Sequence, residues 1–370
     1  MTWFTAADCR LEDFRALVEQ KTDPNDYPNA SDVVQNVLVY DAPALANTPE
    51  LQSELARALM DGPGIVVFRD AFRHDVVDRA TAVFFDMIAE QKQAGMVGGD
   101  HFAKPGANDR VWGALDKFAV RDPSAFADYY QNDVLALIST AWLGAGYQLT
   151  SQINVVNPGG QAQVAHRDYH LGFMSQEQAS RYPAHVHMLS PALTLQGAVA
   201  HVDMPVETGP TLYLPHSQKF PPGYIAFHQS EFTAYFEANH VQLPLAKGDA
   251  AFFNPALFHG AGTNRSADVR RMANLLQVSS AFGRAMESVD RTAMSIALYP
   301  VLQAFDGNVA NVIAASAEGY AFPTNLDRDQ PIGGLAPQTQ AELVAQALEE
   351  KWDSATFEKA LHDQQVRRRG

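Results

Sequence analysis

Short apolar runs separated by glycine, proline and asparagine occupy the middle of the chain, from about residue 147 to about residue 280. This spacing is typical of the short strands of a sandwich or barrel. We expect strands at 148–156, 163–168, 193–202, 211–214, 248–253 and 271–279. The pattern predicts a mainly β fold with a jelly-roll core.

Helical patterns flank this region. Thr48-Pro49-Glu50 supplies an N-cap, a proline at the first helical position and an acid in the first turn, so a helix should run to about Met60. After the break at Asp61–Gly64, the apolar Ile65–Phe68 indicates a buried strand. Further helices are expected at 8–19, 75–94, 124–143 and 337–352. We therefore expect an N-terminal extension (1–48), a central domain with N-terminal helices (49–282), and a mostly helical C-terminal region (283–370).

Composition and charge narrow the class of protein. The chain has 370 residues, enough to bury a large core. A net charge of −15 argues against a nucleic acid partner, because phosphate binding requires clustered lysine and arginine. One cysteine, Cys9, excludes intramolecular disulfides and cysteine-based zinc sites. No apolar stretch long enough for a membrane span and no signal-like N-terminus are seen, so we expect no membrane partner and a cytoplasmic location.

The candidate chemistry lies in two segments of the predicted β region. His166 and Asp168 are two residues apart, so in an extended segment they face the same side while Arg167 faces the other. His259 follows within Phe258-His259-Gly260-Ala261-Gly262-Thr263-Asn264. Two imidazoles and one carboxylate are a ligand set for Fe(II) that leaves coordination positions open. Arg270, 11 residues after His259, adds a planar cation suited to a carboxylate, and the adjacent Arg271 is the alternative.

These segments, together with Glu207-Thr208-Gly209-Pro210-Thr211-Leu212-Tyr213-Leu214-Pro215-His216-Ser217, resemble the phytanoyl-CoA dioxygenase family over roughly residues 50–280. The resemblance implies a double-stranded β-helix, which is a cupin-like jelly roll with helical flanks. It also implies Fe(II), 2-oxoglutarate as cosubstrate, and dioxygen. In that scheme His166, Asp168 and His259 hold the iron and carry the catalysis, and Arg270 binds the far carboxylate of 2-oxoglutarate.

Two departures from the family pattern stand out. Arg167 occupies the position between the first two ligands where relatives often have glutamine. The proline-glycine-serine-histidine signature is replaced by Pro215-His216-Ser217-Gln218. Neither departure touches a predicted ligand. The carboxylate Asp168 favours hydroxylation, since halogenating relatives have a small residue there.

Other residues are candidates for the pocket. Gln163 and Thr211 are expected beside the cosubstrate, and Gln152 and Asn154, on the preceding strand, beside the substrate. The long segment 172–191 interrupts the strands and has the length and polarity of a lid, in which Arg181 or Tyr182 would contact the substrate. Three aromatic residues are candidates for an apolar wall: Trp112, Tyr169 and Phe173.

The sequence thus favours an iron and 2-oxoglutarate-dependent dioxygenase that hydroxylates a small organic molecule and releases succinate and CO2. Two alternatives use the same scaffold. One is a cupin-like metal-dependent isomerase or hydrolase that does not use 2-oxoglutarate, which Arg270 argues against. The other is an inactive binding protein, which the intact triad argues against. Copies of the chain would associate, if at all, through the C-terminal helical region.

Overall fold

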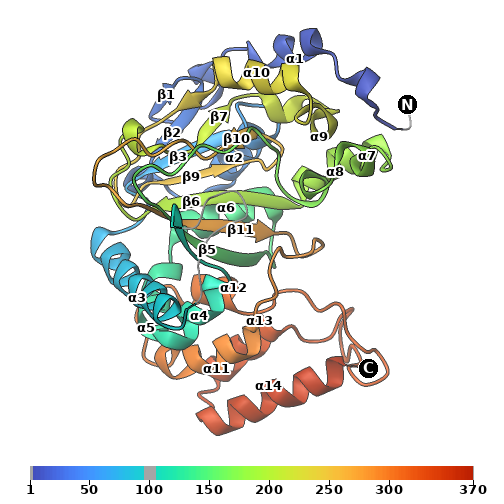
Figure 1. Ribbon diagram of the computed structural model, residues 1–370. Helices are drawn as coiled ribbons and strands as arrows, with labels where there is room; N and C mark the ends of the chain where they lie inside the picture. Colours follow the sequence, from blue (N-terminus) through green and yellow to red (C-terminus); the bar gives the residue numbers. More distant parts are fainter. Residues whose placement is uncertain (1–2, 96–105, 370) are drawn as a thin grey trace.

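A large sheet and a small sheet form the centre of the computed structural model, which describes residues 3–95 and 106–369 (Figure 1). The large sheet has, in spatial order, β1 (Asp32–Val34), β2 (Val37–Asp41), β3 (Ile65–Arg69), β9 (Ala250–Phe253), β6 (Thr194–Ala200), β11 (Arg271–Ser279), β5 (Gln148–Val156) and β4 (Asn108–Val111). Its neighbours are antiparallel except β2 and β3. The small sheet is antiparallel and holds β10 (Phe258–Gly260), β7 (Leu212–Leu214) and β8 (Val241–Gln242).

The two sheets pack against each other through a cluster of buried residues from β2, β3 and β9 on one side and Tyr213 of β7 on the other. Side chains from both sheets also line one cavity. The two sheets therefore face each other across this cavity.

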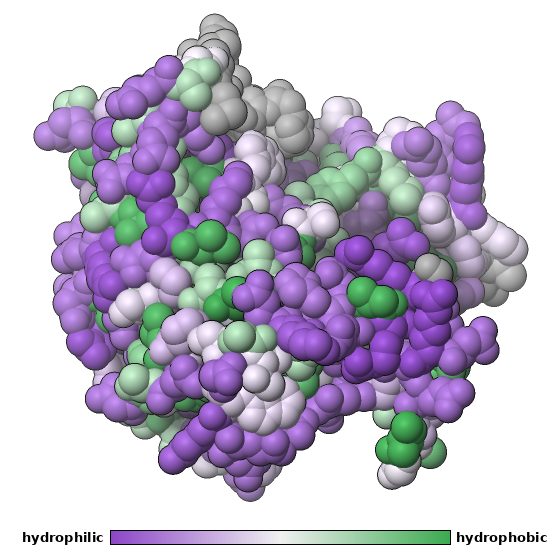
Figure 2. Space-filling model, turned by 90° about the horizontal axis from the view of Figure 1, so that it is seen from below, coloured by the Kyte–Doolittle hydropathy of each residue, from purple (hydrophilic) through white to green (hydrophobic). Residues whose placement is uncertain are grey.

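Helices cover the other face of the large sheet and extend below it in Figure 1. They are α2 (Pro49–Met60), α3 (His74–Gln93), α4 (Ala114–Arg121), α5 (Pro123–Tyr130), α6 (Asp133–Leu143), α11 (Arg291–Leu302), α12 (Val309–Ser316), α13 (Gln340–Glu349) and α14 (Ser354–Arg368). The largest hydrophobic core lies between these helices and the sheet, and it includes Phe68, Phe84, Phe118, Phe252, Leu276 and Leu298. On the face seen from below, hydrophilic residues dominate and hydrophobic ones are scattered (Figure 2).

The remaining helices lie beside the small sheet and the edge of the large one. They are α1 (Leu11–Val18), α7 (Gln176–Ala179), α8 (Ala184–Ala192), α9 (Gly223–Ala226) and α10 (Ser230–Asn239). A second core forms around Phe14, which has aromatic contacts with Phe220, Phe232 and Phe258. No helix among the described residues is long and apolar enough to cross a membrane.

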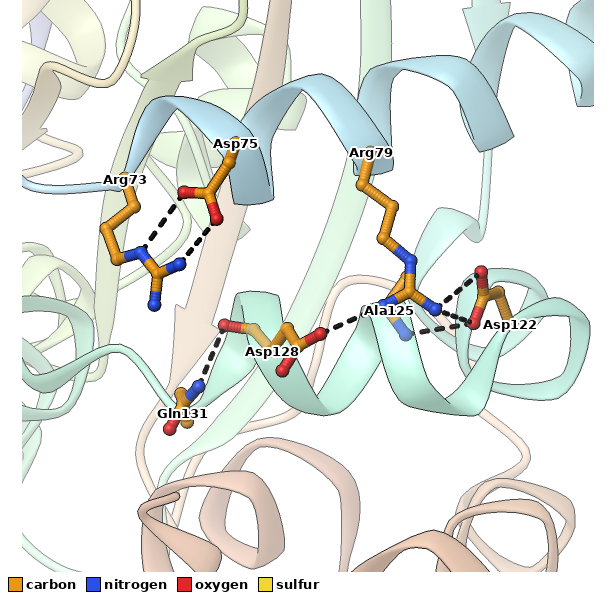
Figure 3. A network of polar contacts seen from close by, with 7 residues as sticks. All are labelled: Arg73, Asp75, Arg79, Asp122, Ala125, Asp128 and Gln131. Carbon is orange, nitrogen blue, oxygen red and sulfur yellow. Dashed lines mark hydrogen bonds and ion pairs between the residues drawn. The ribbon is translucent and has the colours of Figure 1, made fainter. Parts of the chain in front are cut away.

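Surface ion pairs tie α3 to α5. The guanidinium of Arg79 lies 2.9 Å from a carboxylate oxygen of Asp122 and 2.9 Å from one of Asp128 (Figure 3). Asp122 also caps α5, because its side chain accepts a hydrogen bond from the backbone N–H of Ala125. Because these groups are partly exposed to water, each ion pair adds little to the free energy of unfolding, typically less than about 1 kcal/mol.

Several elements match the sequence pattern closely. The helix α2 begins at Pro49 and ends at Met60, with the hydroxyl of Thr48 accepting from the N–H of Leu51 at 3.2 Å. The strands β5 and β11 have the predicted bounds, and β3, β6, β7 and β9 lie within one to two residues of theirs. The region after residue 282 contains four helices in its described part, as expected of a mostly helical segment.

Other expectations are corrected. Helices hold more of the described residues than strands do, so the chain is a mixed structure and the prediction of a mainly β fold is not confirmed. The predicted strand at 163–168 is an irregular segment with a single bridge between His166 and His259. The expected helix over 124–143 is interrupted at Gln131 and Asn132, where Asn132 caps α6. The strands β1 and β2 add residues 32–41 to the sheet where no strand is predicted.

Candidate metal centre

His166, Asp168 and His259 meet at one end of the small sheet. His259 lies on β10, opposite Tyr213 of β7. Reciprocal backbone hydrogen bonds of 3.0 and 3.1 Å join His166 to His259 and align the two imidazoles. The candidate ligand atoms of the three side chains all lie within 4.8 Å of one another. The structure thus brings together residues that are 91 positions apart, as the resemblance implies.

Both imidazoles are oriented by their own backbone. The Nδ1 atom of His166 lies 2.8 Å from the carbonyl oxygen of Val164, and that of His259 lies 2.8 Å from the carbonyl oxygen of Leu257. A carbonyl only accepts, so each Nδ1 carries a proton, and each Nε2 atom faces the carboxylate of Asp168. The Nε2 atoms lie 3.7 Å and 3.3 Å from carboxylate oxygens of Asp168. Burial and the neighbouring His259 lower the pKa of His166, which favours the neutral, ligating form.

Asp168 is held by contacts on several sides. The backbone N–H of Asp168 donates to the carbonyl of Pro255, and the backbone carbonyl of Asp168 accepts from the hydroxyl of Tyr224. The side-chain amide of Gln196 donates to its Oδ2 atom. Burial by itself would raise the pKa of Asp168, but the contact with His259 and the neighbouring imidazole of His166 lower that pKa overall. The carboxylate is therefore ionised, as a metal ligand must be.

A cavity of about 580 Å³ opens in front of the triad. The large sheet supplies one wall through alternate residues of its strands, because side chains two apart along a strand share a face. These residues are Asn108 and Arg110 of β4, Gln152 and Asn154 of β5, Gln196 and Ala198 of β6, and Arg271, Ala273, Leu275 and Gln277 of β11. Tyr213 of β7 and Thr211, which directly precedes β7, line the cavity on the side of the small sheet.

Arg271 is the basic residue of β11 that lines this cavity. Its side chain is buried at 6% exposure, and its Nη1 atom has no hydrogen-bond partner. Burial lowers its pKa to about 10. No carboxylate among residues 3–95 and 106–369 forms an ion pair with it. A buried guanidinium without a protein anion is costly, so an anionic ligand in the cavity would compensate for it.

Arg270 points away from the cavity. Its guanidinium lies 3.0 Å from the carboxylate of Asp109 on β4 and 4.8 Å over the ring of Phe85 on α3. It precedes β11 by one residue, and the alternation of the strand therefore directs it to the face opposite Arg271. Arg270 is thus not positioned to contact a ligand beside the triad, although it has the family spacing.

The four other polar candidates line the same cavity: Gln152, Asn154, Gln163 and Thr211. The carbonyl oxygen of the Gln163 side chain accepts from the N–H of Ala261, which joins it to the segment that follows His259. Gln152 is almost fully buried and accepts from a guanidinium N–H of Arg110 at 3.1 Å. Their roles beside cosubstrate and substrate are argued below.

The segment 172–191 is largely helical and docked, with α7 and α8 in it. His187 of α8 is buried, at 3.1 Å from the carbonyl of Ala179, and its ring contacts Phe4. Arg181 and Tyr182 are exposed and do not line the cavity, and Arg181 pairs with Glu177 at 2.7 Å. Within the segment 172–191, the residues that line the cavity are Gly172 and Phe173.

Several cavity residues were not expected from the sequence: Arg110, Gln196, Gln277 and Met286. The residues of this set that lie on strands could be found from the alternation of side chains, once one cavity-facing residue of each strand is known. Of the aromatic candidates, Trp112 and Phe173 line the cavity, whereas Tyr169 is buried beside it. Met286 follows β11 and comes from the C-terminal region, so that region also contributes to the site.

The two departures from the family pattern contact each other. Arg167 is buried at 2% exposure and donates to the carbonyl oxygens of Ser217 and Phe220 at 2.6 and 3.0 Å. Its guanidinium also lies about 5 Å from the rings of Tyr224 and Phe258. A side chain on Gly223 would meet this guanidinium at 1.9 Å. Arg167 therefore anchors the turn at 215–220 behind the triad and does not enter the cavity.

Replacing Arg167 with methionine should lower the free energy of unfolding by about 2 kcal/mol or more, because two buried carbonyl oxygens lose their donors. Methionine keeps most of the apolar volume, so packing changes little. Urea unfolding monitored by circular dichroism measures the effect. Arg181→Met, at an exposed arginine, is the control and should stay within about 0.5 kcal/mol of the parent. Equal stability of the two variants would show that Arg167 is not an anchor.

The sequence pattern of the family described as phytanoyl-CoA dioxygenase matches residues 60–272, which is more than half of the chain. The chain belongs to the phytanoyl-CoA dioxygenase family. It is a non-haem iron and 2-oxoglutarate-dependent enzyme, in agreement with the triad and with the strands that carry it. Curated protein sequences contain no match to it.

Solved structures of similar shape include the non-haem alpha ketoglutarate-dependent epimerase SnoN from nogalamycin biosynthesis, 21% identical with a TM-score of 0.43 over 63% of this chain and 84% of SnoN. AviO1 from Streptomyces viridochromogenes is 17% identical with a TM-score of 0.45, over 65% of this chain and 100% of AviO1. HygX from Streptomyces hygroscopicus, solved with nickel, 2-oxoglutarate and hygromycin B, is 14% identical with a TM-score of 0.42, over 66% of this chain and 91% of HygX.

The residues of this family member suit both groups that the family uses. Two imidazoles and one carboxylate form the donor set that Fe(II) accepts in such oxygenases. The unpartnered Nη1 atom of the buried Arg271 suits one carboxylate of a dicarboxylic acid. Both features face the same cavity.

Proposed function

We propose that this chain hydroxylates a small organic molecule, with 2-oxoglutarate as cosubstrate. The observation that carries the proposal is the placement of the triad and of the buried, unpartnered Arg271 in one cavity. His166, Asp168 and His259 would hold the iron. When bound, iron and 2-oxoglutarate activate dioxygen for oxidation of the substrate, and the cosubstrate leaves as succinate and CO2.

Arg271 takes the role that the family spacing suggests for Arg270. Its planar guanidinium would bind the far carboxylate of 2-oxoglutarate with two parallel N–H donors. Thr211 and Gln163 line the cavity beside the triad and would flank the cosubstrate. The burial of Arg271 strengthens this recognition, because water competes little for a buried guanidinium.

The substrate would occupy the rest of the cavity, beside Gln152 and Asn154. Trp112 and Phe173 supply apolar surface there, and the guanidinium of Arg110 lies 4.7 Å over the ring of Trp112. The volume of about 580 Å³ suits a small molecule that shares the space with 2-oxoglutarate. A wall of amides facing aromatic rings favours a substrate with an apolar body and polar substituents.

Product analysis under isotopically labelled dioxygen tests the type of reaction. The enzyme, supplied with Fe(II) and 2-oxoglutarate, is incubated with a panel of small metabolites, and products are identified by mass spectrometry. Hydroxylation puts one labelled oxygen atom into the product. The carboxylate at Asp168 supports this outcome over halogenation. An epimerised, cyclised or desaturated product without label would contradict hydroxylation and leave the cofactor assignment standing.

Phe173 is the side chain of the segment 172–191 that reaches over the cavity, and it is 60% exposed. We expect Phe173→Ala to weaken substrate binding and to admit water, so the ratio of succinate to oxidised product should rise above that of the parent enzyme. Arg181→Ala, in the same segment but outside the cavity, is the control and should change neither quantity. Equal ratios for the parent and Phe173→Ala would remove the segment from the chemistry.

A further inference from the structure

Gln196 lies between the metal centre and the open part of the cavity. It belongs to β6, is 7% exposed and lines the cavity. Its side-chain N–H donates to the Oδ2 atom of Asp168. Partners of this kind orient a metal-binding carboxylate and tune its basicity.

The orientation of the Gln196 amide follows from this contact. An ionised carboxylate only accepts hydrogen bonds, so the atom facing Asp168 is the amide nitrogen. The amide oxygen, Oε1, is then directed elsewhere, and it is buried without a hydrogen-bond partner among residues 3–95 and 106–369. A buried acceptor without a hydrogen-bond donor destabilises the folded protein. A ligand with an O–H or N–H group would remove this destabilisation.

A second acceptor occupies the same wall. Asn154 of β5 is 9% exposed, lines the cavity, and has a side-chain oxygen without a partner. Gln277 of β11 pairs directly across from Gln196, but its side-chain oxygen accepts from the amide of Gln152 at 3.4 Å. Of these two glutamines, Gln196 is therefore the one that contacts Asp168 and whose side-chain oxygen is available to accept a hydrogen bond from a ligand.

We propose that Gln196 is a positioning residue with two roles: it holds the Asp168 carboxylate for the metal, and its Oε1 atom accepts a hydrogen bond from the substrate. The substrate class is then a small molecule with a hydroxyl or amine N–H group close to the carbon that is oxidised. This inference rests on the proposed function, since it assumes that the triad binds metal and that the substrate shares its cavity. It links substrate recognition to a metal ligand through a single side chain.

The first role is tested by metal binding without turnover. Gln196→Met removes the donor at nearly constant volume, and Gln277→Met makes the same change at the opposed glutamine that does not touch Asp168. Calorimetric titration with Co(II) should show about 10- to 100-fold weaker binding for Gln196→Met and parental binding for Gln277→Met. The visible spectrum of bound Co(II) should change for Gln196→Met alone. Equal affinities and spectra for the two variants would overturn the positioning role.

The second role is tested with matched probes on enzyme loaded with Co(II) and 2-oxoglutarate. The probes are 2-phenylethanol, compared with its methyl ether, and 2-phenylethylamine, compared with its quaternary trimethylammonium counterpart. The second member of each pair has no O–H or N–H. The donor-bearing probe of each pair should bind the parent enzyme about threefold or more tightly, and Gln196→Met should lose the difference. Equal binding within pairs, or no binding of the donor probes, would overturn the acceptor role. The parent comparison stands even if the variant does not fold.

Titration of the parent enzyme with Co(II) and then with 2-oxoglutarate distinguishes failure of the proposed function from failure of the role of Gln196. If the parent binds neither, both the proposed function and the role of Gln196 are wrong. If the parent binds both, and Gln196→Met behaves like Gln277→Met, only the inference about Gln196 fails.

Discussion

Replacing His259 with alanine is expected to abolish turnover and to weaken metal binding by more than about 100-fold, because loss of a direct ligand exceeds the loss caused by a secondary contact. His166→Ala should behave in the same way, since the three ligand atoms within 4.8 Å of one another leave no spare donor among the described residues. The measurements are succinate formation from 2-oxoglutarate and calorimetric titration with Fe(II) under anaerobic conditions.

His185→Ala is the matched control for both variants. His185 lies on α8, is exposed, and takes no part in the cavity. It should keep parental metal binding and turnover. Circular dichroism and unfolding midpoints establish whether each variant is folded. A folded His259→Ala enzyme that still forms succinate at the parental rate would remove His259 from the metal centre.

Replacing Arg271 with lysine is expected to raise the concentration of 2-oxoglutarate required for half-saturation by about 10- to 150-fold. A hydrogen bond to a charged group contributes about 1.5–3 kcal/mol, and lysine cannot form the two parallel bonds of a guanidinium. Arg270→Lys is the matched control at the adjacent position. Its guanidinium pairs with Asp109 outside the cavity, so the requirement should change less than about threefold.

Calorimetric titration of 2-oxoglutarate into metal-loaded variants measures this effect without a known substrate. The ranking of the two lysine variants decides the assignment. If Arg270→Lys binds 2-oxoglutarate weakly and Arg271→Lys binds it like the parent, the cosubstrate lies on the other face of β11. The cavity described above would then not be the cosubstrate site.

The candidate metal centre is predictable from the sequence because its two segments each carry a local signal. His166 and Asp168 are two residues apart, and His259 stands in a glycine-rich segment of recognisable form. The residues that orient these ligands are not predictable in this way. Gln196 lies 28 positions from Asp168, and its contact arises from the pairing of β6 with β9 and β11.

The choice between Arg270 and Arg271 shows the limit of spacing. A shift of one residue along a strand reverses the face on which a side chain lies. The sequence contains two adjacent arginines and does not state which one shares a face with Ala273 and Gln277. The start of β11 at Arg271 and its register against β5 carry that information, and both depend on tertiary pairing.

The segment 172–191 shows why polarity alone does not predict the structure of an insertion. Its polar residues have the composition of a mobile loop, but Ser175 and Gln178 form a capping box that begins α7. Buried contacts of His187 and Ala179 then dock the segment. The short strands β1 and β2 are not predicted either. β1 pairs only with β2, and β2 joins the large sheet through β3, a pairing between regions that no local pattern connects.

Succinate release is the measurement that bears most directly on the central claim. Purified enzyme is reconstituted anaerobically with Fe(II), mixed with 2-oxoglutarate and a panel of small metabolites, and then exposed to air. The account predicts succinate formation that requires Fe(II) and dioxygen, rises with at least one metabolite, and disappears in His259→Ala. Enzyme that binds Fe(II) but forms no succinate with any metabolite, or forms it equally in His259→Ala, would contradict the account.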